Sequence, residues 1–414
     1  MWPIIPRGDA LVVIAVMFVL LLVSSCVFQP AWWRSRIFRA GVALTFGAMM
    51  AGLALWTAGH YGANFDRVLL GTRITYTGIL VLGPAILVLP FTALMDRLLS
   101  RVLSPSLVPS LVPEPDSPSP ALSRRAFITA GTATLPAMAA ITGARGLLDA
   151  SDTPRIAVIP LRFTDLHPDL EGLRILQLSD LHLGACAGLS DLSRALDVVM
   201  AAQKPDLIVL TGDVADDPEL IPGALDLVAR AGARYGVLAS LGNHEYLHDI
   251  AITRPKFEAS VVPLLVSSGQ TLTIGRARLF VGGSDDPVHM HGDIAEMVRP
   301  SIEAAALHAK AGADFRLLLC HRPEGFGPAA KAGFDLTLSG HTHGGQIGVF
   351  GRSLLEKLRP GTGWWGTYAR GRSRLYTTSG FGHWFPFRVG CPTEMPVIVL
   401  EGAPSGADRA RSRV

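Results

Sequence analysis

Acidic and histidine side chains follow a short apolar run near the middle of the chain. Residues 175–178 are expected to form a buried β-strand, and Asp180 and His182 come directly after it. With one residue between them, both side chains can project at the strand's carboxyl end, where ligands bind in open α/β sheets. A carboxylate oxygen and an imidazole nitrogen suit a first-row divalent metal. A single Asp-x-His pair is common in loops, so this pair alone is weak evidence.

Later apolar runs end in the same way, which strengthens the interpretation. Between them, Leu192, Leu196 and Val199 recur at helical spacing before Lys204 and Pro205 stop the helix. Strands that alternate with helices predict an α/β fold whose polar side chains gather at one edge of a sheet. The runs at 207–210, 235–241, 315–320 and 336–338 are followed by Gly212-Asp213, Gly242-Asn243-His244-Glu245, His321-Arg322 and Gly340-His341-Thr342-His343.

This ordered set of residues resembles the complete signature of the calcineurin-like metallophosphoesterases, and the match covers roughly residues 156–402. The extension Gly344-Gly345-Gln346 resembles the bacterial membrane-anchored or twin-arginine-exported subgroup. No position departs from the pattern. The resemblance implies a four-layer αββα sandwich and a centre that holds two divalent metal ions.

Two metal ions about 4 Å apart need a shared ligand and roughly three further ligands each. Carboxylate, imidazole and amide groups suit Mn, Fe, Zn or Co and do not choose among them. The resemblance implies that Asp180, His182 and His343 hold one ion, that Asn243, His321 and His341 hold the other, and that Asp213 bridges them.

Further polar residues near these positions have less certain roles. By resemblance, His244 stabilises the transition state or protonates the leaving oxygen. Glu245 either orients His244 or closes the turn after the strand, and we favour the structural role. Arg322 can contact a substrate phosphate, because a guanidinium forks onto its oxygens, although a surface salt bridge is equally compatible. The remaining candidates are expected to be turn, loop or surface residues: Asp285, Asp286, His248, His289, His291 and His383.

The resemblance implies hydrolysis of a phosphoester or pyrophosphate bond. A hydroxide held between the two ions would attack phosphorus in line with the leaving oxygen. The alternative is a catalytically silent metal-binding scaffold or sensor module on a membrane stalk. A missing ligand would favour that alternative, and none is missing. A transporter is a further alternative, but the apolar segments lack the charged residues of an ion pathway.

The composition indicates a membrane region. Of the 414 residues, 49% are hydrophobic and only 17% are charged, and the apolar excess lies in the first 150 residues. Residues 10–28, 40–58 and 74–95 are each apolar for about the length that a spanning helix needs. The net charge of +3, without a Lys/Arg run, implies no nucleic-acid partner.

The distribution of arginine predicts the orientation of these helices. Residues 34–39 and 97–125 are richer in arginine than the segment between the second and third apolar runs, so the positive-inside rule places the catalytic domain on the extracytoplasmic side. We expect a three-helix transmembrane region over 1–100 and a Pro/Ser-rich linker over 101–122. Residues 123–150 resemble a twin-arginine signal, with possible cleavage after Ala139, or a fourth membrane segment. A metallophosphoesterase domain over 151–403 and a polar tail over 404–414 follow.

A loop-rich stretch after His343 combines aromatic and arginine residues, which suits the rim of a site at a membrane interface. It suggests a lipid-linked substrate of the phospholipid or UDP-diacylglucosamine type. The alternative is a satellite core beneath long loops. The residues are Phe350, Arg352, Arg359, Trp364, Trp365, Tyr368, Arg370, Phe381, Trp384, Phe385, Phe387 and Arg388.

Overall fold

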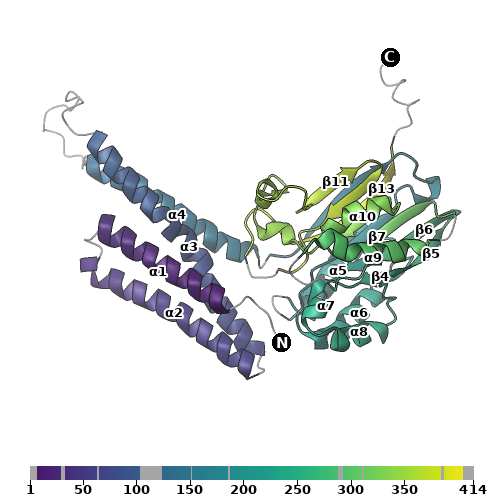
Figure 1. Cartoon of the computed structure of the whole chain (residues 1–414), viewed down its shortest axis with the longest axis horizontal. Coiled ribbons are helices and arrows are strands. Elements are labelled where there is room, and N and C mark those ends of the chain that lie inside the picture. The colour runs from purple at the N-terminus through teal and green to yellow at the C-terminus, as the bar shows by residue number, and fades with distance from the viewer. Residues whose placement is uncertain are drawn as a thin grey trace, which may run out of the picture. The chain divides into compact units, whose positions relative to one another are not determined.

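The computed structural model describes residues 7–28, 33–62, 65–102, 124–150, 152–184, 187–287, 292–309, 312–383 and 387–403 (Figure 1). The chain divides after Leu148 into two compact units. We call them the helical unit (residues 7–148) and the α/β unit (residues 149–403). The expected linker and polar tail lie almost entirely outside the described residues.

The helical unit contains α1 (Arg7–Phe28), α2 (Arg36–Tyr61), α3 (Phe65–Val102) and α4 (Arg124–Asp149). Helices α2 and α3 approach closely: a Cβ atom at Gly71 would overlap the backbone of Trp56. Thr75 Oγ1 also donates a hydrogen bond to the carbonyl of Met49 over 3.2 Å. Small residues at this contact therefore let the two backbones meet, as in membrane helix pairs.

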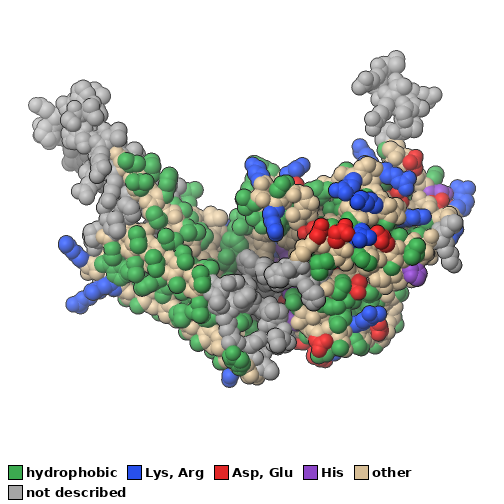
Figure 2. Space-filling view, viewed as in Figure 1, with side chains coloured by type: hydrophobic (Ala, Val, Ile, Leu, Met, Phe, Trp, Pro, Cys, Tyr) green, Lys and Arg blue, Asp and Glu red, His purple; other side chains and the backbone are tan. Residues whose placement is uncertain are grey.

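Two segments of this unit are long and apolar enough to cross a membrane, by length and composition: Arg36–Gly59 and Leu70–Thr92. In the most apolar 18-residue window of each segment, only 17% and 18% of the residues are buried. The apolar part of α1, Leu11–Ser24, is shorter. Figure 2 shows hydrophobic side chains spread over the visible surface of this unit, with Lys and Arg side chains only near its edges. Two of the three expected spans thus meet the criterion among the described residues.

The α/β unit is built on two sheets. The first has the order β1 (Arg155–Phe163), β13 (Glu394–Gly402), β2 (Arg174–Leu178), β3 (Leu207–Thr211) and β4 (Val237–Ser240). The second has the order β11 (Gly366–Arg370), β12 (Ser373–Thr377), β8 (Leu336–Ser339), β7 (Phe315–Leu319), β6 (Ala277–Gly283) and β5 (Ser268–Ile274). Strands β2, β3 and β4 are parallel to one another, as are β6, β7, β8 and β12. Their carboxyl ends can therefore present loops together.

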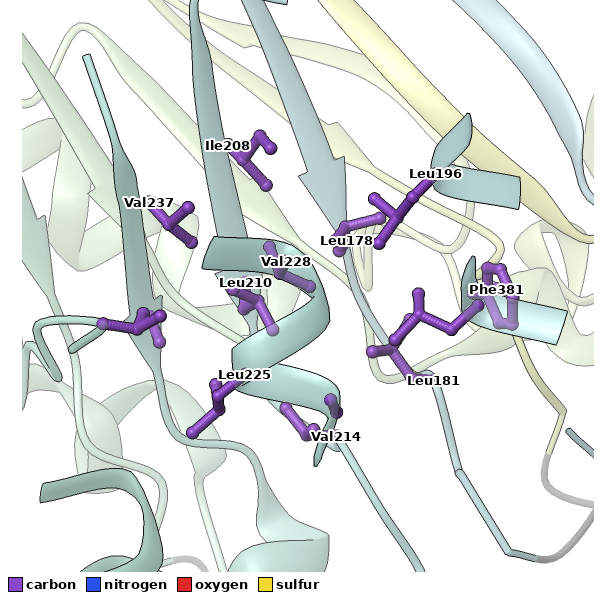
Figure 3. Packing of buried hydrophobic residues seen from close by; sticks show 14 of the residues in the cluster. Leu178, Leu181, Leu196, Ile208, Leu210, Val214, Leu225, Val228, Val237 and Phe381 are labelled. Atoms are coloured by element: carbon purple, nitrogen blue, oxygen red, sulfur yellow. The ribbon is translucent and has the colours of Figure 1, made fainter. Parts of the chain in front are cut away.

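Alternate residues of the strands face two different cores. Ile175 and Val209 belong to the core between the two sheets, where Val281 and Leu317 also lie. The neighbouring residues of β2 and β3, among them Leu178 and Leu210, instead pack against helices on the outer face of the first sheet (Figure 3). Each fully buried side chain of this kind contributes about 1.5–3 kcal/mol.

Helices cover the outer face of each sheet. The first sheet is covered by α5 (Leu189–Gln203), α6 (Ile221–Arg230) and α8 (Ile250–Glu258), and the second by α9 (Ile294–Leu307) and α10 (Phe326–Lys331). The α/β unit is thus the four-layer αββα sandwich, and the predicted fold class is confirmed. The shorter elements are α7 (Asn243–Leu247), β9 (Gly348–Val349), β10 (Arg352–Ser353), η2 (Pro168–Leu170), η3 (Pro218–Leu220), η4 (Pro323–Gly325), η5 (His343–Gln346) and η6 (Leu354–Lys357).

Candidate metal centre

The carboxyl ends of five strands deliver the predicted ligands. Strands β2, β3 and β4 of the first sheet, and β7 and β8 of the second, each end two or three residues before a predicted ligand. The loops from the two sheets meet, because Gln177 Nε2 of β2 donates a hydrogen bond to the carbonyl of Ser339 in β8 over 3.0 Å. Residues separated by more than 160 positions are thereby brought into one site.

One group of ligand atoms comes from Asp180, His182 and His343, all three of them buried. His343 Nε2 lies 3.1 Å from His182 Nε2 and 3.3 Å from Asp180 Oδ1. Two imidazole nitrogens and a carboxylate oxygen this close form a compact O/N donor set that suits a first-row divalent cation.

A second group comes from Asp213, His321 and His341. Asp213 Oδ2 lies 3.1 Å from His321 Nε2 and 3.8 Å from His182 Nε2 of the first group. The Asp213 carboxylate therefore stands between the two groups, where a ligand shared by two ions has to be.

Orphaned polar atoms test whether metal ions fit these groups. Asn243 Oδ1 is buried without a hydrogen-bond partner, and the buried His321 Nε2 has only the ion-pair contact with Asp213 Oδ2 at 3.1 Å, which lacks hydrogen-bond geometry. Leaving a buried polar group without a partner costs about 1–3 kcal/mol. Both atoms belong to residues predicted to ligate the second ion, so a cation there would satisfy them. The donor set fits the implied metal ions.

Hydrogen bonds behind the imidazoles also fit. His182 Nδ1 lies 3.0 Å from Asp216 Oδ1, and His321 Nδ1 lies 2.7 Å from the carbonyl oxygen of Thr211. A ring nitrogen that donates to such an acceptor leaves Nε2 as the ligating atom, the usual arrangement behind metal-bound histidines.

The backbone is strained at the same positions. Asp180, His182, Asp213, His341 and His343 all have φ between 45° and 66°. The left-handed region costs a residue with a Cβ atom roughly 1–2 kcal/mol. Such conformations persist where surrounding contacts hold them, and they cluster at functional sites.

Two glycines in the motifs are needed for space. Glycine precedes Asp213, Asn243 and His341, and at Gly212 it permits a left-handed backbone with φ of +83°. Gly242 and Gly340 do not have positive φ. A Cβ atom at Gly340 would overlap the side chains of Asp180 and Ser179, and one at Gly242 would overlap Asp213. These glycines let the ligand carboxylates lie against the backbone.

Asp216 is a site residue that the sequence reasoning missed. Its Oδ1 atom lies 3.0 Å from His182 Nδ1, 2.7 Å from His244 Nδ1 and 3.4 Å from His248 Nε2. His248 follows α7 in a turn, as expected for a loop residue, but it is buried beside the site and does not lie at the surface. The spacing of Asp216, three residues after Asp213, and of His248, four residues after His244, was the available signal.

His244 lies at the edge of the candidate centre and is partly accessible, with 14% of its side chain exposed. Burial by itself lowers the pKa of His244, but the carboxylates of Asp213 and Asp216 outweigh it and raise the pKa to about 9. Its Nδ1 pairs with Asp216, which leaves Nε2 to meet a ligand.

The other histidines of the site differ in the direction of their pKa shifts. Burial lowers the pKa of His321, but Asp213 and Asp180 raise it to about 10. The pKa of His341 is held well below its usual range by burial and by Arg322, and that of His343 by burial and by His182. His321 therefore carries a proton that a metal ion must displace.

Glu245 has the structural role that we favoured. Its buried carboxylate accepts hydrogen bonds from the backbone N–H groups of Asp213, Val214 and Gly242, over 3.0, 2.8 and 2.7 Å. It ties the loop after β3 to the turn after β4. The positions of Asp213 and Asn243 are thus coupled.

Arg322 is buried, so its interpretation as a surface salt bridge is wrong. Its Nε donates to both carboxylate oxygens of Asp286, over 2.8 and 3.0 Å. Its Nη1 lies 2.8 Å from His341 Nε2, which must accept because a guanidinium has only donors. Asp286, expected in a plain turn, is therefore connected to the site through Arg322.

The aromatic and arginine stretch divides into buried and exposed parts. Trp365, Phe381, Phe387 and Arg388 are buried, so the expectation that they form an exposed rim is wrong. His383, expected in a loop or at the surface, is buried as well. Trp384, Phe385, His289 and His291 lie outside the described residues.

Arg388 lies directly behind the first ligand group. One of its terminal nitrogens donates to the carbonyl oxygens of Ser379 and Gly382, over 2.7 and 2.6 Å. The same nitrogen lies 3.4 Å from His343 Nδ1. The buried part of the aromatic and arginine stretch therefore packs behind the candidate metal centre.

Comparisons with known proteins agree with this geometry. Residues 173–345 match the family model of the calcineurin-like phosphoesterases. A metallophosphoesterase of Campylobacter jejuni is 31% identical over 61% of this chain and 65% of its own length. A transmembrane protein with a metallophosphoesterase domain from Danio rerio is 30% identical over 64% of this chain and 61% of its own. The chain thus spans slightly less than two thirds of these two relatives.

Phosphodiesterase YaeI of Escherichia coli is 28% identical over 67% of this chain and 99% of its own length. Among solved structures, a 5′-nucleotidase precursor from Thermus thermophilus covers 55% of this chain and 54% of its own, with 15% identity. The TM-score for this structure is 0.35.

Proposed function

We propose that the chain is a metal-dependent hydrolase of phosphoester bonds, because residues 173–345 match the calcineurin-like phosphoesterase family. The observation that carries the proposal is the Asp213 carboxylate between two groups of buried ligand atoms. In this proposal two divalent ions bind: Asp180, His182 and His343 hold one, Asn243, His321 and His341 hold the other, and Asp213 serves both. The complete donor set argues against the silent scaffold.

When bound, the ions supply Lewis acidity that activates water and offsets negative charge on the phosphate. The chain's own residues provide the rest of the chemistry. The His244 imidazolium, held at Nδ1 by Asp216 over 2.7 Å, presents Nε2–H to the leaving oxygen. Since its pKa is raised to about 9, the proton is present at neutral pH, as a general acid requires.

Arg322 is our candidate for the substrate phosphate contact. Its Nε and one terminal nitrogen are engaged by Asp286 and His341, and a guanidinium has five N–H donors, so donors remain for a phosphate oxygen. Asp286 fixes the guanidinium beside a ligand of the second ion. Arg322→Lys keeps the charge but loses the fork, and we expect it to raise KM more than it lowers kcat.

The test of the main proposal is Asp213→Asn in the purified full chain. We expect kcat/KM to fall by at least about 10³-fold, because an electrostatic contribution to the transition state is lost, and the content of both ions to fall. Asp226→Asn, an exposed carboxylate on α6, is the matched control and should change neither. Full activity on a panel of phosphomonoesters, diesters and pyrophosphates after Asp213→Asn would overturn the proposal.

We further propose that the helical unit anchors the enzyme in a membrane as a multi-pass region, with the α/β unit on the extracytoplasmic side. The two long apolar segments support the anchor, and arginines near their ends support the orientation. Arg124→Lys with Arg125→Lys tests the export route. Loss of export of a C-terminal reporter indicates a twin-arginine signal, unchanged export indicates an ordinary span, and a cytoplasmic reporter in the unmutated chain contradicts the orientation.

A lipid-linked phosphoester or pyrophosphate remains our proposed substrate class. Because Trp365, Phe381 and Phe387 are buried, the support now rests on the exposed part of the stretch, between Val349 and Arg359. A substrate panel that pairs micellar lipid phosphoesters with soluble analogues tests it. Equal kcat/KM for both kinds of substrate would contradict a lipid preference.

A further inference from the structure

A small lobe protrudes from the α/β unit a few residues after the ligand His343. It consists of strands β9 (Gly348–Val349) and β10 (Arg352–Ser353), which pair antiparallel, and the short helix η6 (Leu354–Lys357). We call residues 348–359 the hairpin lobe. It is attached close to the site, because Gly348 N donates to the carbonyl of Val389 over 2.8 Å, next to the buried Arg388.

Large apolar side chains of the hairpin lobe face solvent. Phe350 is completely exposed, at 101%, and Leu358 is 76% exposed. Leu354 and Val349 are about half exposed. Four large apolar residues exposed within ten positions are unusual for a soluble surface, where such residues are scattered singly.

Basic side chains surround these apolar groups. Arg352, Lys357 and Arg359 are exposed, and the acidic residue of the lobe, Glu356, lies 3.9 Å from Arg352. Figure 2 shows Lys/Arg and hydrophobic side chains next to one another on the projection beside β11. The lobe therefore combines apolar tips with a net positive charge.

The backbone conformation of Phe350 is a second, independent observation. Phe350 and Gly351 are the two loop residues of the hairpin, with φ of 52° and 76°. Two-residue turns with positive φ at both positions favour Asn, Asp and Gly, and a bulky residue there is an outlier. A side chain that is completely exposed gains nothing from the fold to offset this cost. Local choices that contradict the fold mark functional positions.

We propose that the hairpin lobe docks onto the surface of a bilayer that contains anionic phospholipids. Phe350 and Leu358 enter the interface between headgroups and acyl chains, while Arg352, Lys357 and Arg359 meet lipid phosphates. The inference deepens the proposed function, since it rests on the membrane anchoring of the helical unit. It places the mouth of the metal centre at the lipid surface, where a lipid-linked phosphoester is presented.

The experiment uses the full chain in nanodiscs, in a background with Cys26→Ser and Cys186→Ser. An environment-sensitive fluorophore is attached to Phe350→Cys, and the control is Leu307→Cys, at the end of α9, which is 87% exposed. The discs contain phosphatidylcholine with or without phosphatidylglycerol, and a nitroxide-labelled lipid serves as quencher. This readout requires no turnover, so it is independent of catalysis.

In discs with phosphatidylglycerol, we expect the label at position 350 to be blue-shifted and quenched severalfold more than the label at position 307. Removing the basic groups, with Arg352→Gln, Lys357→Gln and Arg359→Gln, should weaken the docking equilibrium about fivefold for each side chain. The same quenching in an Asp213→Asn chain would support docking even if the proposed hydrolysis fails.

Equal quenching at positions 350 and 307 overturns the proposal. Identical quenching in discs without phosphatidylglycerol contradicts the proposed requirement for anionic phospholipids. A blue shift without lipid quenching, which depends on protein concentration, overturns it in favour of a second copy of this chain.

Discussion

Residues in the left-handed backbone region occur both at the strand ends and in the hairpin lobe, but their surroundings differ. Asp180 has φ of 52° and is fully buried, and its carboxylate accepts hydrogen bonds from Ser179 Oγ and from the backbone of His341, over 2.6 and 2.9 Å. Phe350 has the same φ of 52° and a side chain that is completely exposed. The fold offsets the strain at the first position and not at the second.

This difference indicates that strained residues have different roles at the strand ends and in the hairpin lobe. At the strand ends, hydrogen bonds, burial and the proposed ions hold an unfavourable backbone in place, so these residues form a preorganised centre. In the hairpin lobe, whatever offsets the strain must lie outside the unit.

At the strand ends, His244→Asn should cause a large loss of activity without loss of the ions. General acid catalysis contributes about 10²–10⁴-fold, and we expect a loss of this size for substrates with poor leaving groups, with metal content unchanged. An activated aryl ester needs no proton and should lose much less. Equal losses for both kinds of ester would show that His244 binds the transition state and does not protonate.

The two arginines Arg388 and Arg352 should differ in their contribution to stability. Arg388→Met leaves the carbonyls of Ser379, Gly382 and Cys391 without their donor, at about 1 kcal/mol or more each. A total near 3 kcal/mol should lower the Tm of the α/β unit by roughly 6–12 °C. Arg352→Met, on the exposed lobe, should stay within about 0.5 kcal/mol. Near-UV circular dichroism on heating measures the Tm of both variants. Equal Tm values would show that Arg388 contributes no more to stability than Arg352.

Metal uptake should depend on pH because His321 must lose its proton. Its pKa is raised to about 10, so the proton is bound in the metal-free chain throughout the neutral range and each ion bound there displaces it. The apparent affinity should rise about tenfold per pH unit between pH 6 and 8. Competition with a chelator at pH 6, 7 and 8 measures the slope. An affinity independent of pH would contradict the protonated His321.

The smallest effect should be a gain in stability at the lobe. Phe350→Gly relieves the strain of a bulky residue in the left-handed region, and we expect about 1 kcal/mol of added stability. Leu358→Gly is the control, because Leu358 is similarly exposed but has an ordinary φ of −83°. A loss of stability with Phe350→Gly would show that the Phe350 side chain has a stabilising contact in the protein.

The ligand-bearing strands could be predicted because short apolar runs ending in polar residues define both an element and its end. Residues 207–210 became Leu207–Thr211 and residues 336–338 became Leu336–Ser339, errors of one residue. The edge strands β5 and β11 were not predicted, since their burial is partial and their apolar pattern is correspondingly weak.

Asp216 and Arg388 could not be assigned because their roles arise from contacts between distant segments. In the sequence Asp216 resembles an ordinary turn residue. Only the fold brings His182, His244 and His248 around it. Arg388 and Phe350 belong to one loop-rich stretch without periodicity, and nothing in a loop's composition says which side chains turn inward. The sequence therefore indicates which polar residues gather at the strand ends, but it does not show which side chains surround them.

The position of β13 has a consequence for biosynthesis. This strand, Glu394–Gly402, lies between β1 and β2 and pairs with both, and the segment before it binds the loop after β2, because Gly382 N donates to the carbonyl of Asp180 over 2.7 Å. A ribosome adds about 5–20 residues per second, so β1 waits more than ten seconds for its neighbour. Until then the first sheet is open, and Asp180 lacks part of the backbone that holds it. The metal centre is therefore assembled only after translation of the whole α/β unit, and a chain shortened before β13 would be a substrate for proteases.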